Sequence, residues 1–244
     1  MADGQVLLGL GMATLIPTKG TPCVTVAGSV KGARVAGLLL QAGTSPDGGA
    51  VSPTLLQWGD DSRDSASRVA PADYGFIHDV FARVGGPKLP KGEQAKATSM
   101  MQIDSNGVIG DNMWLWRADH SEGGGLVKNG DNPCDNALIV NGDDVSTQDH
   151  PHHSCHYLIY PGMSLRDCLR LQVTMYGLAA EHTLKDIVLW NGDRGSSYFF
   201  QAELPYDVKT YPYAGYHVAD DVDTHKSYGA GVYHFFRERC PVSY

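Results

Sequence analysis

Three short segments in the middle of the chain repeat one pattern, in which an apolar or aromatic run ends in alanine followed by an acid. The segments are Asn112–His120, Val173–His182 and Ser196–Glu203, and their acids are Asp119, Glu181 and Glu203. A turn rich in glycine, asparagine and aspartate precedes each run. Strands and turns repeated at coarse intervals are typical of a solenoid, in which each repeat packs against its neighbours.

Outside this region, short β-branched and aliphatic runs between glycines predict further strands. These runs are Val6–Ile16, Cys23–Ala27, Ala33–Ala36, Gly37–Leu40, Phe76–Val84 and Gly231–Phe236. Helical periodicity is nearly absent, and only Ser164–Gln172 is a candidate for a short helix. The loops Ala42–Pro71 and Lys209–Tyr216 are expected to wall a groove on one side of the solenoid.

Length and composition fit one domain, residues 1–244, with a sizeable core. The 29 glycines exceed the ordinary share of about 7% and follow no collagen period, which indicates the turns of a β fold. The net charge of −8 disfavours nucleic acid and anionic membranes as partners, whereas neutral substrates are compatible with it. No apolar run reaches the length of about 18 residues that a transmembrane helix needs. Met1–Leu10 lacks the basic region of a signal peptide. We expect the chain to be a monomer.

The segment Ser146–Gln172 interrupts the place where Val145 is expected to run into the strand at Thr174. It contains His150, His152, His153, Cys155 and His156, a composition that suits zinc or copper. It also fits a solvated histidine-rich loop. A third interpretation is a retained intron, because Val145–Thr147 can be encoded as GTG-AGT-AC and Gln172 as CAG, which are plausible intron borders. We favour the retained intron, and we predict no metal ion or other cofactor.

Stretches spread over most of the chain carry a family resemblance. They are Leu8–Leu15, Val35–Leu38, His78–Gly86, Gly110–His120, Tyr176–His182, Trp190–Gly192 and Phe200–Asp207. They resemble the right-handed parallel β-helix proteins of the pectate-lyase-like superfamily. More closely, they resemble secreted carbohydrate-associated proteins of fungi and bacteria that are labelled coagulation factor 5/8-type or discoidin-domain proteins.

The resemblance implies an all-β, single-stranded, right-handed parallel β-helix. Distant similarity to β-1,3-glucanases of the laminarinase type implies a glycoside hydrolase that acts, outside the cell, on a neutral cell-wall polysaccharide such as β-glucan. Related proteins have more β-helix before the segment matching Val6, so we expect an N-terminally truncated chain. The alternatives are a non-catalytic glycan-binding module, an inactive fragment and a polysaccharide lyase, which the few basic residues near the acids disfavour.

The acids Asp119, Glu181 and Glu203 are the candidate catalytic residues. If the three segments stack in register, the acids form one column with neighbours about 5 Å apart. Glycoside cleavage needs carboxyl groups about 5–5.5 Å apart for a nucleophile, or about 6.5–9.5 Å apart with a water between them. We predict the central Glu181 as the general acid, with Glu203 or Asp119 activating the water. The alternative is a structural ladder of hydrogen-bonded acids and amides.

Aromatic and polar side chains are dense around these acids. Aromatic rings suit sugars because they are flat and apolar with a polar rim. The candidate substrate-binding residues are Trp114, Trp116, His120, His182, Trp190, Tyr206 and Asp207. Trp114 and Trp116 are two residues apart, so they are expected to share one face of a strand. For any single aromatic residue, packing in the core is the alternative.

Overall fold

The computed structural model describes residues 1–244 except residue 19 and the segments 46–52, 61–69, 143–172 and 237–244. The histidine-rich insertion 146–172 and the helix predicted at Ser164–Gln172 therefore lie outside the described residues. Within the described part, strands and turns dominate, and the one helical element is the short 3-10 helix η1 (Pro71–Asp73). No helix in that part is long and apolar enough to cross a membrane.

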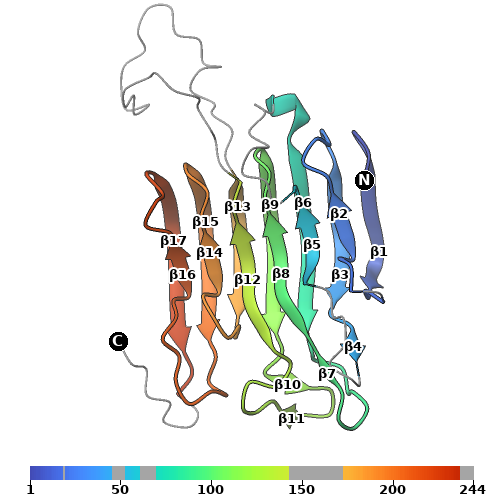
Figure 1. The fold of residues 1–244 in the computed structure, drawn as a ribbon, viewed down its shortest axis with the longest axis vertical. Coiled ribbons are helices and arrows are strands. Elements are labelled where there is room, and N and C mark those ends of the chain that lie inside the picture. Colours follow the sequence, from blue (N-terminus) through green and yellow to red (C-terminus); the bar gives the residue numbers. More distant parts are fainter. Residues whose placement is uncertain (19, 46–52, 61–69, 143–172, 237–244) are drawn as a thin grey trace, which may run out of the picture.

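Two parallel sheets run along the molecule (Figure 1). The first contains, in spatial order, β1 (Val6–Leu15), β3 (Arg34–Gln41), β6 (Gly75–Val84), β9 (Val108–Arg117), β13 (Thr174–Glu181), β15 (Gly195–Leu204) and β17 (His225–His234). The second contains β2 (Val24–Val26), β5 (Thr54–Trp58), β8 (Ala97–Ile103), β12 (Cys134–Val140), β14 (Val188–Trp190) and β16 (Tyr216–Val218).

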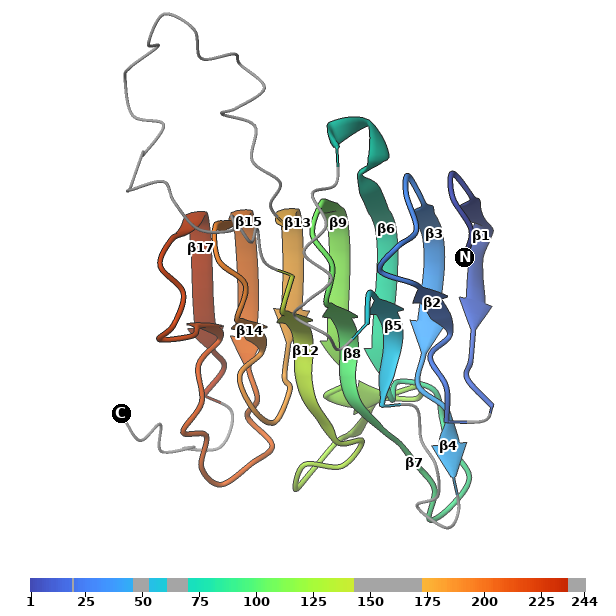
Figure 2. The same cartoon turned by 45° about the horizontal axis from the view of Figure 1, so that its top comes forward.

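Apart from β4 (Thr44–Ser45), β7 (Gln94–Ala95), β10 (His120–Ser121) and β11 (Gly125–Leu126), successive strands alternate between the two sheets. Each turn of the backbone therefore adds one strand to each sheet. The coils advance from β1 at one end to β17 at the other in both views (Figure 2). This is the parallel β-helix that the sequence predicts. Two small antiparallel pairs, β4 with β7 and β10 with β11, are built from the loops.

The three segments that end in an acid are neighbouring rungs of the first sheet, as predicted, because β13 pairs with β9 on one side and with β15 on the other. The sequence pattern missed most of the second sheet. The pattern does not predict strands β8, β12 and β14, and Thr54–Trp58, which forms β5, interrupts the expected loop Ala42–Pro71. Strand β14 has only three residues, and polar residues such as Gln102 in β8 and Asn136 in β12 interrupt the apolar pattern.

The core lies between the two sheets and consists of inward side chains from β2 to β15. Leu138 of the second sheet and Leu178 and Phe200 of the first are at most 1% exposed. Trp190 also lies fully buried in this core, and it packs so closely against Gly195 that a Cβ there would come within 2.2 Å of the indole nitrogen. Glycine at this position is therefore required by space.

A polar ladder follows the ends of strands β8, β12 and β14. The Asn141 side chain donates a hydrogen bond of 2.6 Å to Asp104, and the Asn191 side chain donates one of 2.7 Å to Asn141. Such a ladder satisfies buried amides and carboxylates from one coil to the next. A hydrogen-bonded ladder of acids and amides therefore exists in this fold at the turns of the second sheet.

One residue in each of six neighbouring strands of the first sheet has a positive φ. These residues are Gly37, Asp79, Asn112, Gly177, Phe199 and Gly229, with φ between 51° and 68°. Each of these residues is an extra residue in its strand. In β15, for example, the successive residues Tyr198 and Phe199 are both exposed, and the alternation of buried and more exposed residues resumes at Phe200. Glycine, asparagine and aspartate adopt this conformation most readily, which makes Phe199 the exception.

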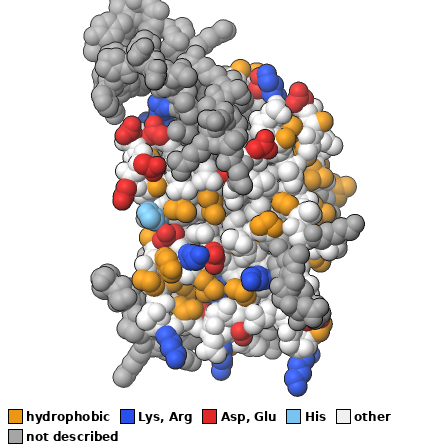
Figure 3. Space-filling model, viewed as in Figure 1, with side chains coloured by type: hydrophobic (Ala, Val, Ile, Leu, Met, Phe, Trp, Pro, Cys, Tyr) orange, Lys and Arg blue, Asp and Glu red, His pale blue; other side chains and the backbone are white. Residues whose placement is uncertain are grey.

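On the face drawn in Figure 3, the lysine and arginine side chains that the structure describes lie in separate groups among acidic and uncharged ones. They form no continuous basic surface on that face.

Phe199 provides a test of this backbone constraint. Its side chain is 71% exposed, so its loss removes little packing, whereas a left-handed backbone costs an ordinary residue about 1–2 kcal/mol. We expect Phe199→Asn to raise the free energy of unfolding by roughly 0.5–1 kcal/mol, because asparagine tolerates this conformation. Denaturant titration followed by circular dichroism measures the change.

Gly229 is the matched control in the neighbouring strand. A Cβ at Gly229 would meet no atom closer than 3.7 Å, so Gly229→Ala adds backbone strain without a clash. We expect this substitution to lower the free energy of unfolding by about 1 kcal/mol. Equal stabilities for the wild type and both variants would contradict the assignment of strain to this position.

Candidate active site

An open pocket of about 490 Å³ lies on the outer face of the seven-stranded sheet. It is lined by Phe81, Trp114, Trp116, Asp119, His120, Glu181, His182 and Glu203. Its size is in the range of about 300–1,000 Å³ that is usual for small-molecule sites. A second hollow of about 540 Å³, beside Lys31 and Asp73, has no aromatic side chain in its lining. The first pocket thus brings together all three candidate acids and four candidate sugar contacts.

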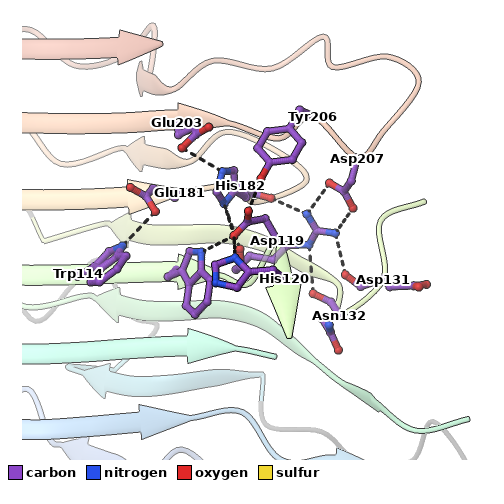
Figure 4. A network of polar contacts seen from close by, with 12 residues as sticks. Trp114, Asp119, His120, Asp131, Asn132, Glu181, His182, Glu203, Tyr206 and Asp207 are labelled. Carbon is purple, nitrogen blue, oxygen red and sulfur yellow. Dashed lines mark hydrogen bonds and ion pairs between the residues drawn. The ribbon is translucent and has the colours of Figure 1, made fainter. Parts of the chain in front are cut away.

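The pairing of the strands determines which acids are neighbours. Glu181 is directly opposite Glu203 on β15, but its partner on β9 is Trp116. The prediction of one column of three acids is therefore wrong for Asp119. Strand β9 ends at Arg117, so Asp119 belongs to the loop beyond it, and this loop brings the side chain back to the pocket (Figure 4).

Glu181 accepts hydrogen bonds from two side chains. The indole N–H of Trp114 donates to Oε2 at 3.2 Å, and the side-chain amide of Gln201 donates to Oε1 at 3.4 Å. An indole has no acceptor, and the amide nitrogen can only donate. Both oxygens of Glu181 therefore act as acceptors.

Glu203 has a different environment. The Tyr233 hydroxyl donates to its Oε2 at 3.0 Å, and Nε2 of the buried His182 lies 3.4 Å from the same oxygen. Burial, the hydrogen bond to Glu203 and the charges of Glu203 and Glu181 raise the pKa of Tyr233 to about 12. Tyr233 therefore keeps its proton at neutral pH and remains a donor.

Asp119 is the centre of a hydrogen-bonded network at the edge of the pocket (Figure 4). The indole of Trp116 donates to Oδ1 at 3.2 Å, His120 Nδ1 lies 2.9 Å from the same oxygen, and the Tyr206 hydroxyl donates to Oδ2. Burial raises the pKa of Asp119, but the hydrogen bond from Tyr206 and the charges of His182 and His120 lower it below its usual range. Asp119 is therefore ionised at neutral pH and orients the side chains around it.

Three aromatic rings form the floor beside the acids. Phe81 and Trp114 are stacked, with ring centroids 4.9 Å apart, and Trp114 and Trp116 are tilted, with centroids 5.9 Å apart. The two tryptophans share one face, as predicted, and Trp114 remains 44% exposed. An exposed aromatic surface next to carboxylates suits a sugar ring, which has apolar C–H faces and a polar edge.

Arg117 holds the loops that carry this network. Its guanidinium is fully buried and forms an ion pair with Asp207 through both carboxylate oxygens, at 2.9 and 2.7 Å. It also donates to the backbone oxygens of Asp131, Asn132 and His182, at 2.7, 3.2 and 2.9 Å. Burial raises the pKa of Asp207, but the hydrogen bonds and charge of Arg117 outweigh it and hold that pKa below its usual range.

Two candidate substrate-binding residues are corrected by the structure. Trp190 is fully buried in the core between the sheets, so it cannot contact a sugar. The Asp207 side chain is 5% exposed, and both its oxygens are bound to Arg117, so its role is structural. Tyr206 acts at the edge of the pocket through Asp119. In the described part of the chain, no group of three or more histidine, cysteine, aspartate or glutamate side chains could hold a metal ion.

Sequence reasoning also missed residues of the site. Phe81 lies next to Trp114 across the strand pair β6–β9, whereas Gln201 and Tyr233 contact the two glutamates from β15 and β17. The apolar run containing Phe81 was recognised as a strand, but only the register between strands places it beside Trp114. No local motif marks Gln201 or Tyr233.

The fold and this pocket define the class of protein: a parallel β-helix of the pectate lyase-like kind with a carboxylate-bearing pocket on one sheet. The chain belongs to the family of LAM55 pectate lyase-like domains, whose model matches residues 1–163 and 170–203. This membership agrees with the right-handed β-helix and with the similarity to laminarinase-type glucanases that the sequence predicts.

Relatives of known activity support the same placement. The chain is 34% identical over 240 residues to an exo-β-1,3-glucanase of Streptomyces sp. (strain SirexAA-E / ActE), and the match covers 95% of this chain and 32% of the relative. The structure of sacteLam55A from Streptomyces sp. SirexAA-E matches with a TM-score of 0.73 and 34% identity, over 96% of this chain and 36% of that one. A glutamate-to-alanine variant of sacteLam55A in complex with glucose matches with a TM-score of 0.72 and 33% identity, over the same shares. The chain thus spans about a third of the length of these proteins.

The buried ion pair yields a prediction for stability. Asp207→Asn leaves the Arg117 charge buried without its counter-ion, so we expect the free energy of unfolding at pH 7 to fall by about 3–5 kcal/mol. Because the pKa of Asp207 is lowered by folding, its stabilisation is complete above the unfolded value of about 3.9 and is lost as the pH falls through the lower folded value. The gap between wild type and variant should therefore shrink in acid, which denaturant titrations at several pH values measure.

The exposed pair Lys185–Asp135 is the matched control. Its side chains are 51% and 36% exposed and lie 2.9 Å apart. We expect Asp135→Asn to cost less than about 1 kcal/mol, because water screens a surface pair. Similar losses for the two variants would contradict the structural role of the Arg117–Asp207 pair.

Proposed function

We propose that this chain is a glycoside hydrolase that cleaves β-1,3-glucan, releasing glucose from chain ends. The observation that carries the proposal is the in-register pair Glu181 and Glu203 beside the exposed aromatic floor of Phe81, Trp114 and Trp116. The similarity to an exo-β-1,3-glucanase over 95% of the chain supports the choice of substrate, and the glucose complex of sacteLam55A supports a carbohydrate ligand.

The hydrogen bonds around the two glutamates favour different roles for them. Glu181 receives only donors, from Trp114 and Gln201, which suits an ionised carboxylate that takes a proton from the attacking water. Glu203 accepts a hydrogen bond from Tyr233, but it also faces Nε2 of His182, which in its unprotonated form can accept a hydrogen bond from a Glu203 hydroxyl. We therefore assign the general acid to Glu203 and the general base to Glu181, which reverses the roles that the sequence alone suggested.

The reaction then follows from these roles. The proton of Glu203 passes to the glycosidic oxygen while the bond from that oxygen to the anomeric carbon breaks. The strand spacing applies to the backbone, whereas the Glu181 carboxyl group turns toward Trp114 on β9 and the Glu203 carboxyl group toward Tyr233 on β17. In the proposed reaction a water lies between the two groups, and Glu181 takes a proton from this water as its oxygen bonds to the anomeric carbon. The aromatic floor holds the sugar ring against the two carboxyl groups, and the ionised Asp119 fixes Trp116 and Tyr206 around it.

Substrates with different leaving groups separate the two roles. A natural laminari-oligosaccharide needs a proton on its leaving oxygen, whereas dinitrophenolate leaves without one. We expect Glu203→Gln to lower the turnover of laminari-oligosaccharides by about 10²–10⁴-fold while largely keeping that of dinitrophenyl β-glucoside. Glu181→Gln should lower the turnover of both substrates, as release of glucose and of dinitrophenolate will measure.

The exposed Glu122, which does not line the pocket, is the control, and Glu122→Gln should behave like the wild type. Loss of both activities in Glu203→Gln, with full activity of Glu181→Gln on dinitrophenyl β-glucoside, would reverse the two roles. A wild-type chain that binds insoluble β-glucan but releases no sugar would refute the hydrolase and favour a glycan-binding module.

A further inference from the structure

His182 lies directly beneath the proposed general acid. It follows Glu181 at the end of β13, its side chain is 3% exposed, and its backbone has φ of 65°. The left-handed backbone turns the imidazole away from the outward direction of Glu181 and toward Glu203 and Asp119 (Figure 4). Positive φ is uncommon outside glycine, but histidine, like asparagine and aspartate, adopts it more often than other residues do.

The contacts of the imidazole determine which nitrogen carries hydrogen. Nδ1 lies 3.3 Å from the backbone oxygen of Arg117, and a carbonyl oxygen can only accept. The hydrogen is therefore on Nδ1 in the neutral ring, and Nε2 presents its lone pair. That Nε2 is buried without a hydrogen-bond partner in the structure, and the nearest polar group given for it is Oε2 of Glu203 at 3.4 Å.

Charged and titratable groups face His182 from three sides. Glu203, with Tyr233 bound to it, approaches from β15 and β17. Asp119 lies 3.9 Å from Nδ1, in the loop after β9, and the Tyr206 ring meets the imidazole edge-on at 5.2 Å. The Arg117 guanidinium contacts the His182 backbone oxygen, but its charge is paired with Asp207. Within this set, Glu203 is the carboxyl group that faces the free nitrogen.

We propose that His182 and Glu203 share one proton, and that His182 is the positioning residue that keeps this proton available to Glu203 as the general acid. The proposal rests on the function proposed above and deepens it. The shared proton sits either on Glu203, bonded to Nε2, or on Nε2, bonded to the Glu203 carboxylate. Two ionisable groups that interact strongly lose their protons in steps that belong to the pair and not to either group alone.

The proton balance of a catalytic cycle follows. Glu203 gives the shared proton to the glycosidic oxygen, which leaves a carboxylate opposite the Nε2 lone pair. The proton that Glu181 removes from water returns to solvent, and a solvent proton reloads the pair. No proton is gained or lost over the cycle, and His182, which is 3% exposed, acts through Glu203.

His182→Asn tests the proposal with little disturbance of the backbone, because asparagine tolerates the left-handed conformation and its side chain is too short to replace Nε2 beside Glu203. We expect the alkaline limb of kcat/KM for laminari-oligosaccharides to move down by about one pH unit or more. The turnover of dinitrophenyl β-glucoside, which needs no proton on its leaving group, should fall less than that of laminari-oligosaccharides, and a circular dichroism spectrum equal to that of the wild type shows that the variant is folded.

His217 supplies the matched control, because its imidazole is 44% exposed and bound to Asp186, outside the pocket. The pH profile of His217→Asn should equal that of the wild type. An unmoved alkaline limb in His182→Asn, in a chain that hydrolyses β-1,3-glucan, overturns the shared proton while leaving the proposed function intact. A wild-type chain without hydrolysis overturns the proposed function itself.

A measurement on the wild type covers the case in which His182→Asn does not fold. Nitrogen-15 NMR of the histidine rings distinguishes hydrogen on Nδ1 from hydrogen on Nε2. We expect His182 to carry hydrogen on Nδ1 at every pH and to show its Nε2 titration coupled to that of Glu203, so that Glu203→Gln shifts it. A neutral ring with hydrogen on Nε2, or a titration that Glu203→Gln leaves unchanged, overturns the proposal.

Discussion

The fully buried guanidinium of Arg117 is the interaction on which the geometry of the pocket depends. Its five N–H groups are all used, two on Asp207 and three on backbone oxygens of the loop 131–132 and of His182. A buried charge is tolerated only when its partners are in place, and leaving one out costs several kcal/mol. Arg117 therefore fixes the end of β9, the turn after β13 and the segment after β15 in one arrangement. The loop that carries Asp119 and the segment that carries Tyr206 are held by the same contact.

Parallel stacking adds the second constraint. Because β13 and β15 are in register, two glutamates at the same point of successive coils must be neighbours, with a spacing set by the sheet. Their surroundings then make them different. Glu181 accepts hydrogen bonds from Trp114 and Gln201 beside the aromatic floor. Glu203 accepts a hydrogen bond from Tyr233 and lies next to Nε2 of His182. Two identical side chains thus have different hydrogen-bond partners, and the different roles proposed for them rest on this difference.

The sequence predicted the rungs of the first sheet and the pairing of Glu181 with Glu203, because the alanine-acid ends of those two segments are at equivalent positions. The same alignment failed for Asp119, since β9 ends two residues earlier, where Arg117 turns inward. Trp190 was misplaced because density of aromatic residues along the chain does not distinguish core from surface. Phe81, Gln201 and Tyr233 depend on register between strands far apart in sequence, which no local pattern contains. The strands of the second sheet lack a clear apolar pattern because polar residues, such as Gln102 in β8 and Asn136 in β12, lie within them.

We propose that a glucan binds on the floor of Phe81, Trp114 and Trp116 with the scissile bond between Glu181 and Glu203. The most direct test is a crystal structure of the Glu203→Gln variant with laminaritriose. We predict a sugar ring stacked on the exposed face of Trp114 and a glycosidic oxygen within hydrogen-bond distance of the amide at position 203. A saccharide bound elsewhere on the solenoid, or one in this pocket with its glycosidic oxygens directed away from both glutamates, would contradict the account.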